Sequence, residues 1–251
     1  MGVALTVADS KRAFHLAFPY VIAPLYRRVV DELLVELHLL SHQAGFELNG
    51  LFSCGLIQVF DGLTKGYRPE HHREGLLAAL CAASGFDAQQ LRQQRDWAMA
   101  AMGHHSVDEV KQWVEQQGEG APQPVAAALE GIRRPDFHYS RLMAVGLFSL
   151  LEQAQGADGM DPATLRSYAH DLGTAMGLLR DRLDKDINLY ATNMAKLAQA
   201  VELMEETVAA DRRKREKAQA EKQAPPSEII PPSENGPTEG IPPAGSGDHG
   251  A

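Results

Sequence analysis

The chain has 251 residues, 44% of them apolar, and a formal net charge of -9. This length and composition predict a globular protein with one large core or two small ones, and they exclude a chain that is disordered throughout. Only 24 Lys and Arg stand against 33 Asp and Glu, which excludes nucleic-acid binding because the basic surface that a phosphate backbone requires is missing. The longest apolar run, residues 142–151, is too short to cross a bilayer, and the N-terminus lacks the features of a secretory signal. We therefore expect a cytoplasmic protein.

Helix start and stop signals punctuate most of the chain, and no stretch shows the period-two alternation of a strand. We predict an all-α fold with a compact multi-helix body, a long C-terminal helix with a heptad pattern, and a disordered tail rich in Pro and Gly. Cap residues and first-turn prolines mark the expected helices. These cover residues 10–18, 24–42, 49–65, 69–84, 87–102, 106–117, 125–133 and 140–155, a helix from 161, and 178–223.

Three of these helices are expected to build the core. The helix at 24–42 has a wide apolar stripe and should pack firmly on the body, and the very apolar helix at 140–155 should be nearly surrounded. Between them, the helix at 49–65 contains Gly50, Gly55 and Gly62. Because a glycine inside a helix costs about 1 kcal/mol relative to alanine, these glycines indicate close backbone contact with a neighbouring element.

The last helix carries an unbroken heptad seam. Its apolar residues are spaced alternately by four and three positions: Leu183, Ile187, Tyr190, Met194, Leu197, Val201, Met204 and Val208. Such a seam requires a helical partner, which is another helix of the same chain, a second copy, or a different protein; periodicity alone does not choose. We divide the chain into a helical body (1–177), the long coiled-coil-like helix (178–223) and the disordered acidic tail (224–251).

Beyond the seam the helix becomes basic. Arg212, Arg213, Lys214, Arg215, Lys217 and Lys222 outnumber the acidic residues among them. We expect this end to project into solvent, where basic side chains suit a helix C-terminus and also allow weak contact with anionic lipid headgroups.

No constellation of residues predicts chemistry. His38 and His42 share a helix face, but neither a zinc-protease motif nor a Glu-x-x-His motif accompanies them. We therefore expect the histidines at the surface or at its boundary. Cys54 and Cys81 lie far apart in apolar sequence and are interpreted as core thiols. We predict no catalytic residue, no metal site and no cofactor.

Short strings occurring in order along residues 6–206 carry a family resemblance. They are TVADSKR (6–12), YRRVV (26–30), ELLVELHLL (32–40), VFDG (59–62), GYRPE (66–70), ALC (79–81), YSRL (139–142), GLF (146–148), KD (185–186) and LY (189–190). In these strings and their order the chain resembles the thylakoid formation protein family of cyanobacteria and plastids. Because we expect no transit peptide, the chain is similar to a cyanobacterial member.

The resemblance implies an all-helical protein that supports thylakoid biogenesis and photosystem II assembly or repair. It implies an FtsH-type membrane metalloprotease and photosystem II subunits as partners, peripheral association with the cytoplasmic face of the thylakoid, and neither a reaction nor a cofactor. We interpret the chain as a non-enzymatic accessory factor; the alternative is a helical carrier of chlorophyll or lipid, with residues 142–151 lining a cavity. The residues expected to bind a partner are Tyr26, Arg27, Arg28, Tyr139, Arg141, Lys185, Arg212, Arg213, Lys214 and Arg215.

Overall fold

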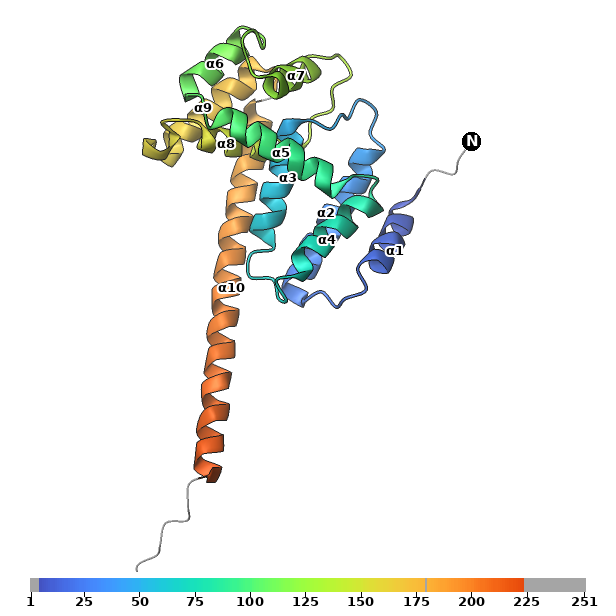
Figure 1. Ribbon diagram of the computed structural model, residues 1–251, viewed down its shortest axis with the longest axis vertical. Coiled ribbons are helices and arrows are strands. Elements are labelled where there is room, and N and C mark those ends of the chain that lie inside the picture. The colour runs from blue at the N-terminus through green and yellow to red at the C-terminus, as the bar shows by residue number, and fades with distance from the viewer. Residues whose placement is uncertain (1–4, 179, 224–251) are drawn as a thin grey trace, which may run out of the picture. The chain divides into compact units, whose positions relative to one another are not determined.

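The computed structural model describes residues 5–178 and 180–223, which form ten α-helices and one short 3-10 helix (Figure 1). The only β pairing in this part of the chain is an isolated bridge between Ser106 and Gln155. The predicted all-α class is therefore confirmed. The helices are α1 (Val7–Ala17), α2 (Pro24–Ser41), α3 (Gly50–Leu63), α4 (His72–Ala83), α5 (Ala88–Met102), α6 (Val107–Glu115), α7 (Gln123–Ile132), α8 (Arg141–Gln153), α9 (Pro162–Ala175) and α10 (Arg180–Gln223), with the 3-10 helix η1 (Ala157–Gly159) before α9.

Most helices begin where the sequence placed a cap. The side chains of Asn49, Asp87, Ser106, Ser140 and Asp161 each accept a hydrogen bond from a backbone N–H in the first turn of the following helix. These bonds satisfy donors that the helix itself leaves unpaired. The predicted starts of α3, α5, α6, α8 and α9 are thus confirmed.

The start of α1 was predicted wrongly. It begins after Thr6, which forms a capping box with Asp9, in which the Asp9 N–H donates to Thr6 Oγ1 at 3.2 Å and the Thr6 N–H to Asp9 Oδ2 at 3.0 Å. Ser10 lies inside the helix and is buried, with its hydroxyl 2.9 Å from Nδ1 of His38. The Ser10 side chain, which was expected to cap the helix, therefore contacts His38 of α2 instead.

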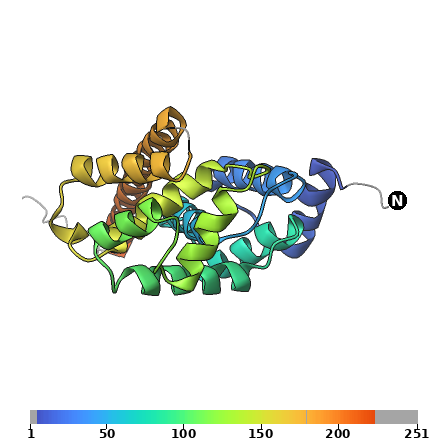
Figure 2. The ribbon, with the colours of Figure 1, turned by 90° about the horizontal axis from the view of Figure 1, so that it is seen from above.

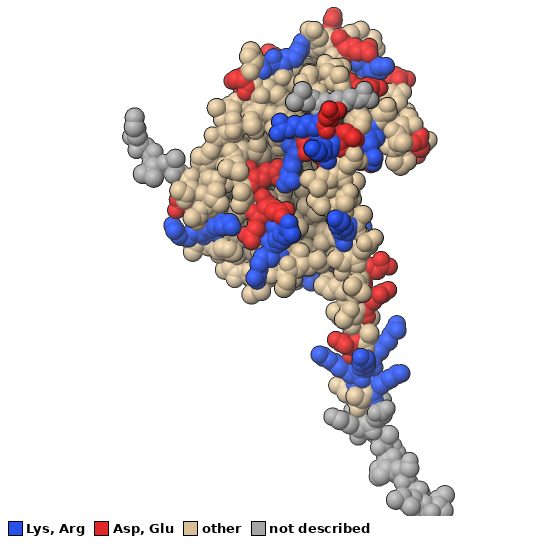
Figure 3. Space-filling view, turned by 180° about the vertical axis from the view of Figure 1, so that it is seen from behind, with Lys and Arg blue, Asp and Glu red and all other residues tan. Residues whose placement is uncertain are grey.

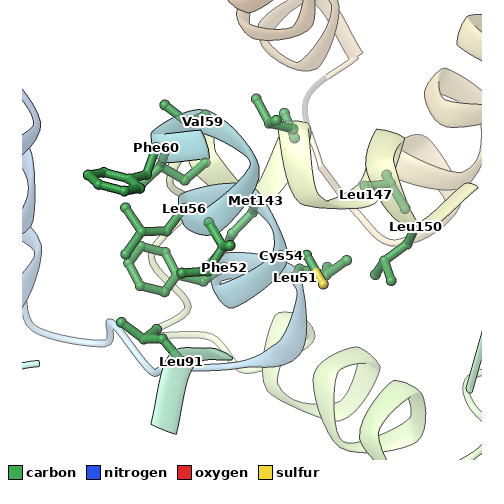
Figure 4. Close-up of a cluster of buried hydrophobic side chains, with 14 of the residues drawn as sticks. Leu51, Phe52, Cys54, Leu56, Val59, Phe60, Leu91, Met143, Leu147 and Leu150 are labelled. Atoms are coloured by element: carbon green, nitrogen blue, oxygen red, sulfur yellow. The ribbon is translucent and has the colours of Figure 1, made fainter. Parts of the chain in front are cut away.

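The centre of the body is the crossing of α3 and α8, the most extensive contact between helices among the described residues. A Cβ on Gly55 would lie 1.7 Å from the carbonyl oxygen of Leu142, and one on Gly146 would lie 1.9 Å from that of Leu51. The two backbones touch because both positions lack a side chain, as the glycines of α3 predicted. Around this crossing, Figure 4 shows side chains of α3, α5 and α8 in one apolar cluster.

The remaining helices of the body surround α3 and α8. On one side α1, α2 and α4 pack on one another, and on the other α5 packs on both α3 and α8, while α9 packs on α6 and α8. Seen from above, α3 lies at the centre of the body (Figure 2). All residues from Leu142 to Leu147 are buried in α8, which confirms that this helix is nearly surrounded.

The heptad seam of α10 packs on its own chain. Leu183, Ile187 and Leu197 are buried, and Tyr190, Met194 and Val201 are partly buried against the same core. Glycines provide the room: an added Cβ would lie 2.3 Å from Met194 Sδ at Gly62 and 2.7 Å from Val201 Cγ1 at Gly66. Of the three partners left open by the sequence, the same chain is the one found for these six positions.

The chain divides into two compact units, residues 1–205 and 206–251. The first unit includes the first half of α10, which contributes buried side chains to the body, whereas the sequence predicted a body that ends at residue 177. In the second unit, all side chains from 206 to 219 are exposed. The predicted disordered tail, 224–251, lies outside the described residues. Within the described part of the chain, no helix combines the length and the apolar character of a membrane span.

Candidate functional site

A groove of about 1080 Å³ lies on the surface of the body between α2, the segment leading into α8, and the start of α10. We call it the charged groove. Its walls hold Lys11, Arg27, Arg28, Asp31, Glu32, Glu36, Tyr139, Arg141, Arg182 and Asp186, with Pro24, Val35, Leu39, Leu40, His138 and Ser140 between them. On the face shown in Figure 3, basic and acidic side chains of the body lie interleaved.

The strongest contact in the charged groove joins α8 to α2. Arg141 Nε lies 2.9 and 3.0 Å from the two carboxylate oxygens of Glu36, and Nη2 lies 2.6 Å from Oε2. This fork geometry is the strong form of an ion pair. The hydrogen bond to Glu36 raises the pKa of Arg141, so the guanidinium stays charged. Ser140 caps α8 and thereby places Arg141 at the first helical position.

Tyr139 joins the same segment to α10. Its hydroxyl donates to Asp186 Oδ2 at 2.8 Å, and the guanidinium carbon of Arg182 lies 5.2 Å from the centre of its ring. Burial, followed by the hydrogen bond to Asp186, raises the pKa of the phenol. The phenol therefore remains protonated and acts as a fixed donor, holding Arg182 and Asp186 in the groove wall.

The α2 wall is less tightly paired. Arg28 Nε lies 2.8 Å from Oε1 of Glu32, which is four positions further along the same helix. Arg27 and Asp31 are also four positions apart but form no ion pair; α1 packs on α2 and places Lys11 3.8 Å from Asp31. Arg27 is exposed and has no ion-pair partner among the residues that the structure describes. It therefore remains available to an incoming carboxylate.

The structure brings together four of the residues expected to bind a partner, Arg27, Arg28, Tyr139 and Arg141. Tyr26 does not join them: it is only 1% exposed, and its hydroxyl donates to the carbonyl of Lys65 at 3.1 Å. Its proposed partner contact is wrong because the aromatic ring is a core element. Lys185 is exposed on α10, beside a groove residue.

The four basic residues expected at the far end of α10 belong to the second unit. Arg212, Arg213, Lys214 and Arg215 are exposed, and Arg212 pairs with Glu216 at 2.8 Å. They therefore form a second candidate surface, separate in the chain from the charged groove.

Sequence reasoning missed Glu36, Arg182 and Asp186 as groove residues. The available signal was spacing: Glu36 follows Arg28 and Glu32 at four-residue steps on one face of α2, and Arg182 and Asp186 stand four apart on α10. Spacing does not predict, however, that these faces of α2 and α10 line the same groove.

One histidine and both cysteines are buried in the body. His38 is 6% exposed, so the expectation of a surface histidine is wrong at this position; α1 covers it, and burial lowers its pKa. Cys54 and Cys81 are buried free thiols as predicted, and burial raises the pKa of each to about 12. Among the described residues, no group of three or more His, Cys, Asp or Glu is placed to hold a metal ion.

Comparison with known proteins identifies the family. A family model described as thylakoid formation protein matches residues 6–219. Protein Thf1 of Prochlorococcus marinus is 52% identical over 218 residues, covering 86% of this chain and 90% of its own, and that of Parasynechococcus marenigrum is 50% identical over 218 residues, covering 86% and 94%. A solved structure of Psb29 superposes with a TM-score of 0.73 at 32% identity, covering 84% of this chain and 98% of its own. The chain therefore belongs to the thylakoid formation protein family.

Proposed function

We propose that the protein is a non-enzymatic accessory factor in thylakoid membrane formation and photosystem II assembly or repair, acting by protein–protein contact. Its principal partner is an FtsH-type membrane protease, together with photosystem II subunits, at the cytoplasmic face of the thylakoid. Membership of the thylakoid formation protein family supports a role in this biogenesis process. The charged groove is the observation that supports recognition of a partner, because it gathers residues from 11 to 186 into one wide surface.

The charges of the groove favour recognition over chemistry. Glu36 and Asp186 accept hydrogen bonds from Arg141 and Tyr139, so both carboxylates are already engaged by neighbouring side chains in the groove wall. Arg27 and the exposed side chain of Leu39 add one free cation and one apolar contact to the same surface.

The carrier alternative is not supported at the position where the sequence placed it. The apolar space beside α8, lined by residues such as Leu51, Met102 and Leu147, has a volume of only about 40 Å³. Ligand pockets for molecules of drug size or larger have volumes of about 300–1,000 Å³. A chlorophyll does not fit into this space unless the surrounding helices, α3 and α5 to α8, move apart.

The test is affinity purification of the tagged protein from cyanobacterial membranes, followed by mass spectrometry. The bait proteins are the full chain, the double variant R27E/R28E, and a chain ending at Val208. A matched control, K111E/K196E, reverses two exposed cations of the body that do not line the groove.

Recovery of an FtsH-type protease or photosystem II subunits by the full chain and the control, with loss in R27E/R28E, supports docking at the charged groove. Loss only in the shortened chain moves docking to the end of α10. Recovery of neither partner by the full chain would overturn the proposed function.

A further inference from the structure

The second unit contains a short, strongly basic stretch. Between Asp211 and Lys217 there are five Lys or Arg and two acidic residues. Arg212 is paired with Glu216 at 2.8 Å. The remaining cations, Arg213, Lys214, Arg215 and Lys217, are exposed and make no ion pair within the described part of the chain. We call these four residues the basic cluster.

Helix stability does not explain the basic cluster. Cations stabilise a helix C-terminus through the macrodipole, but this effect falls off within the last turn. α10 ends at Gln223, so that even Lys217 lies more than one turn before the end. Arg213 and Lys217, which lie four positions apart on one face of the helix, moreover repel each other as like charges. The basic cluster therefore slightly destabilises the helix, so helix stability does not account for its presence.

The charge of the rest of the chain makes the cluster distinctive. Residues 1–205 contain 18 Lys and Arg against 25 Asp and Glu. An anionic surface therefore repels the body by its net charge and attracts the basic cluster. A charge distribution of this kind selects which part of a protein meets such a surface.

The side chains around the cluster favour a lipid surface over a protein surface. Residues 209–219 contain no aromatic or large apolar side chain, whereas specific protein interfaces depend on such anchors at their centre. The cations also point to several sides of the helix (Figure 3), since successive residues are about 100° apart. A docking protein would contact only one side.

A layer of anionic headgroups attracts all four cations of the basic cluster. Its attraction extends over about one Debye length, about 10 Å at moderate salt, which is the width of the helix. We propose that the basic cluster binds anionic lipid headgroups at the membrane surface. This inference rests on the proposed function, for which it names the element that holds the accessory factor at its membrane.

The test uses purified full-length protein and vesicles, without any protein partner. Co-sedimentation is measured with phosphatidylcholine vesicles containing about one-third phosphatidylglycerol, and with phosphatidylcholine alone. The variant R213Q/K214Q/R215Q/K217Q removes the basic cluster. The matched control, R12Q/K65Q/K111Q/K196Q, removes four exposed cations from the body, and circular dichroism checks that both variants keep their helices.

The wild-type protein and the control should bind the anionic vesicles, and binding should disappear at about 1 M salt, where the Debye length is about 3 Å. Each basic residue near an anionic surface changes binding by about five-fold, so loss of four should weaken it by at least about 100-fold. Equal binding by the cluster variant and the wild type would overturn the inference, as would an equal loss in the control.

A protein ligand for the cluster gives a different result. In that case the cluster variant sediments with vesicles as the wild type does, but fails to recover the protease from membranes. Because the vesicle assay contains no protease, its failure leaves the proposed function standing, and failure to recover the protease leaves the lipid inference standing.

Discussion

The substitution G146A tests whether the close approach of α3 and α8 holds the body together. A Cβ at this position would lie 1.9 Å from the carbonyl oxygen of Leu51 and 2.9 Å from the backbone nitrogen of Gly55. Both neighbours are backbone atoms, so no side-chain rotation relieves the clash. Ordinary contact begins at 3.4 Å, and the helices would have to separate by about 1.5 Å.

This separation would be costly because α8 is buried on nearly all sides. A gap of about 0.5–1 Å already loses a quarter to a half of the attraction between facing atoms, and overpacking a core costs about 1–3 kcal/mol or more. Alanine returns about 1 kcal/mol through its helix propensity. We expect a net loss of about 2 kcal/mol, which lowers Tm by about 4–8 °C in a domain of this size.

Thermal and urea unfolding measure this loss, and G131A is the matched control. Gly131 also lies inside a helix, α7, but an added Cβ meets nothing within 4 Å. The control should therefore gain up to about 1 kcal/mol. If the two variants unfold alike, the glycine contact between α3 and α8 does not limit the stability of the body.

Three further predictions concern single side chains. R141Q should cost about 1 kcal/mol in urea unfolding, because it breaks the pair with Glu36 in which Arg141 is 43% exposed and partly screened; an unchanged midpoint would show that the pair is energetically neutral. Because burial lowers the pKa of His38, the unfolded chain takes up the proton first, and stability should fall as the pH drops below about 6.5. H38Q should flatten that slope, and a steep residual slope would assign it to other groups. Cys54 and Cys81, with pKa values raised to about 12, should react with a thiol reagent only on unfolding; rapid labelling of the native protein would contradict this burial.

Helices were predictable from this sequence because their signals are local. Asn49, Asp87 and Ser106 cap helices through bonds to residues two or three positions away, and such contacts are visible in a short window of sequence. The error at the first helix has the same origin, since Thr6 and Ser10 are both plausible caps. The capping-box spacing of Thr6 and Asp9 is a local signal in favour of Thr6, and the tertiary contact of Ser10 with His38 agrees with it.

The charged groove was only partly predictable, because its contacts join residues that are far apart in the sequence. Arg141 and Glu36 are 105 positions apart, and Tyr139 and Asp186 are 47 apart. No periodicity relates such pairs. The family strings included all four residues, but they did not indicate that these residues face one another, or that Tyr26 within the same strings is a core residue.

The seam of α10 shows where a periodic pattern stops being informative. Its first six positions, as far as Val201, are covered by the body, whereas Met204 is 36% and Val208 is 64% exposed. The heptad spacing is the same throughout, so the change arises from where the body ends and not from the pattern. A chain ending at Val208 therefore retains every buried seam residue and should keep the stability of the body. Any membrane or partner binding that it loses can then be assigned to the residues removed, because Tyr139, Arg182 and Asp186 still hold the groove in place.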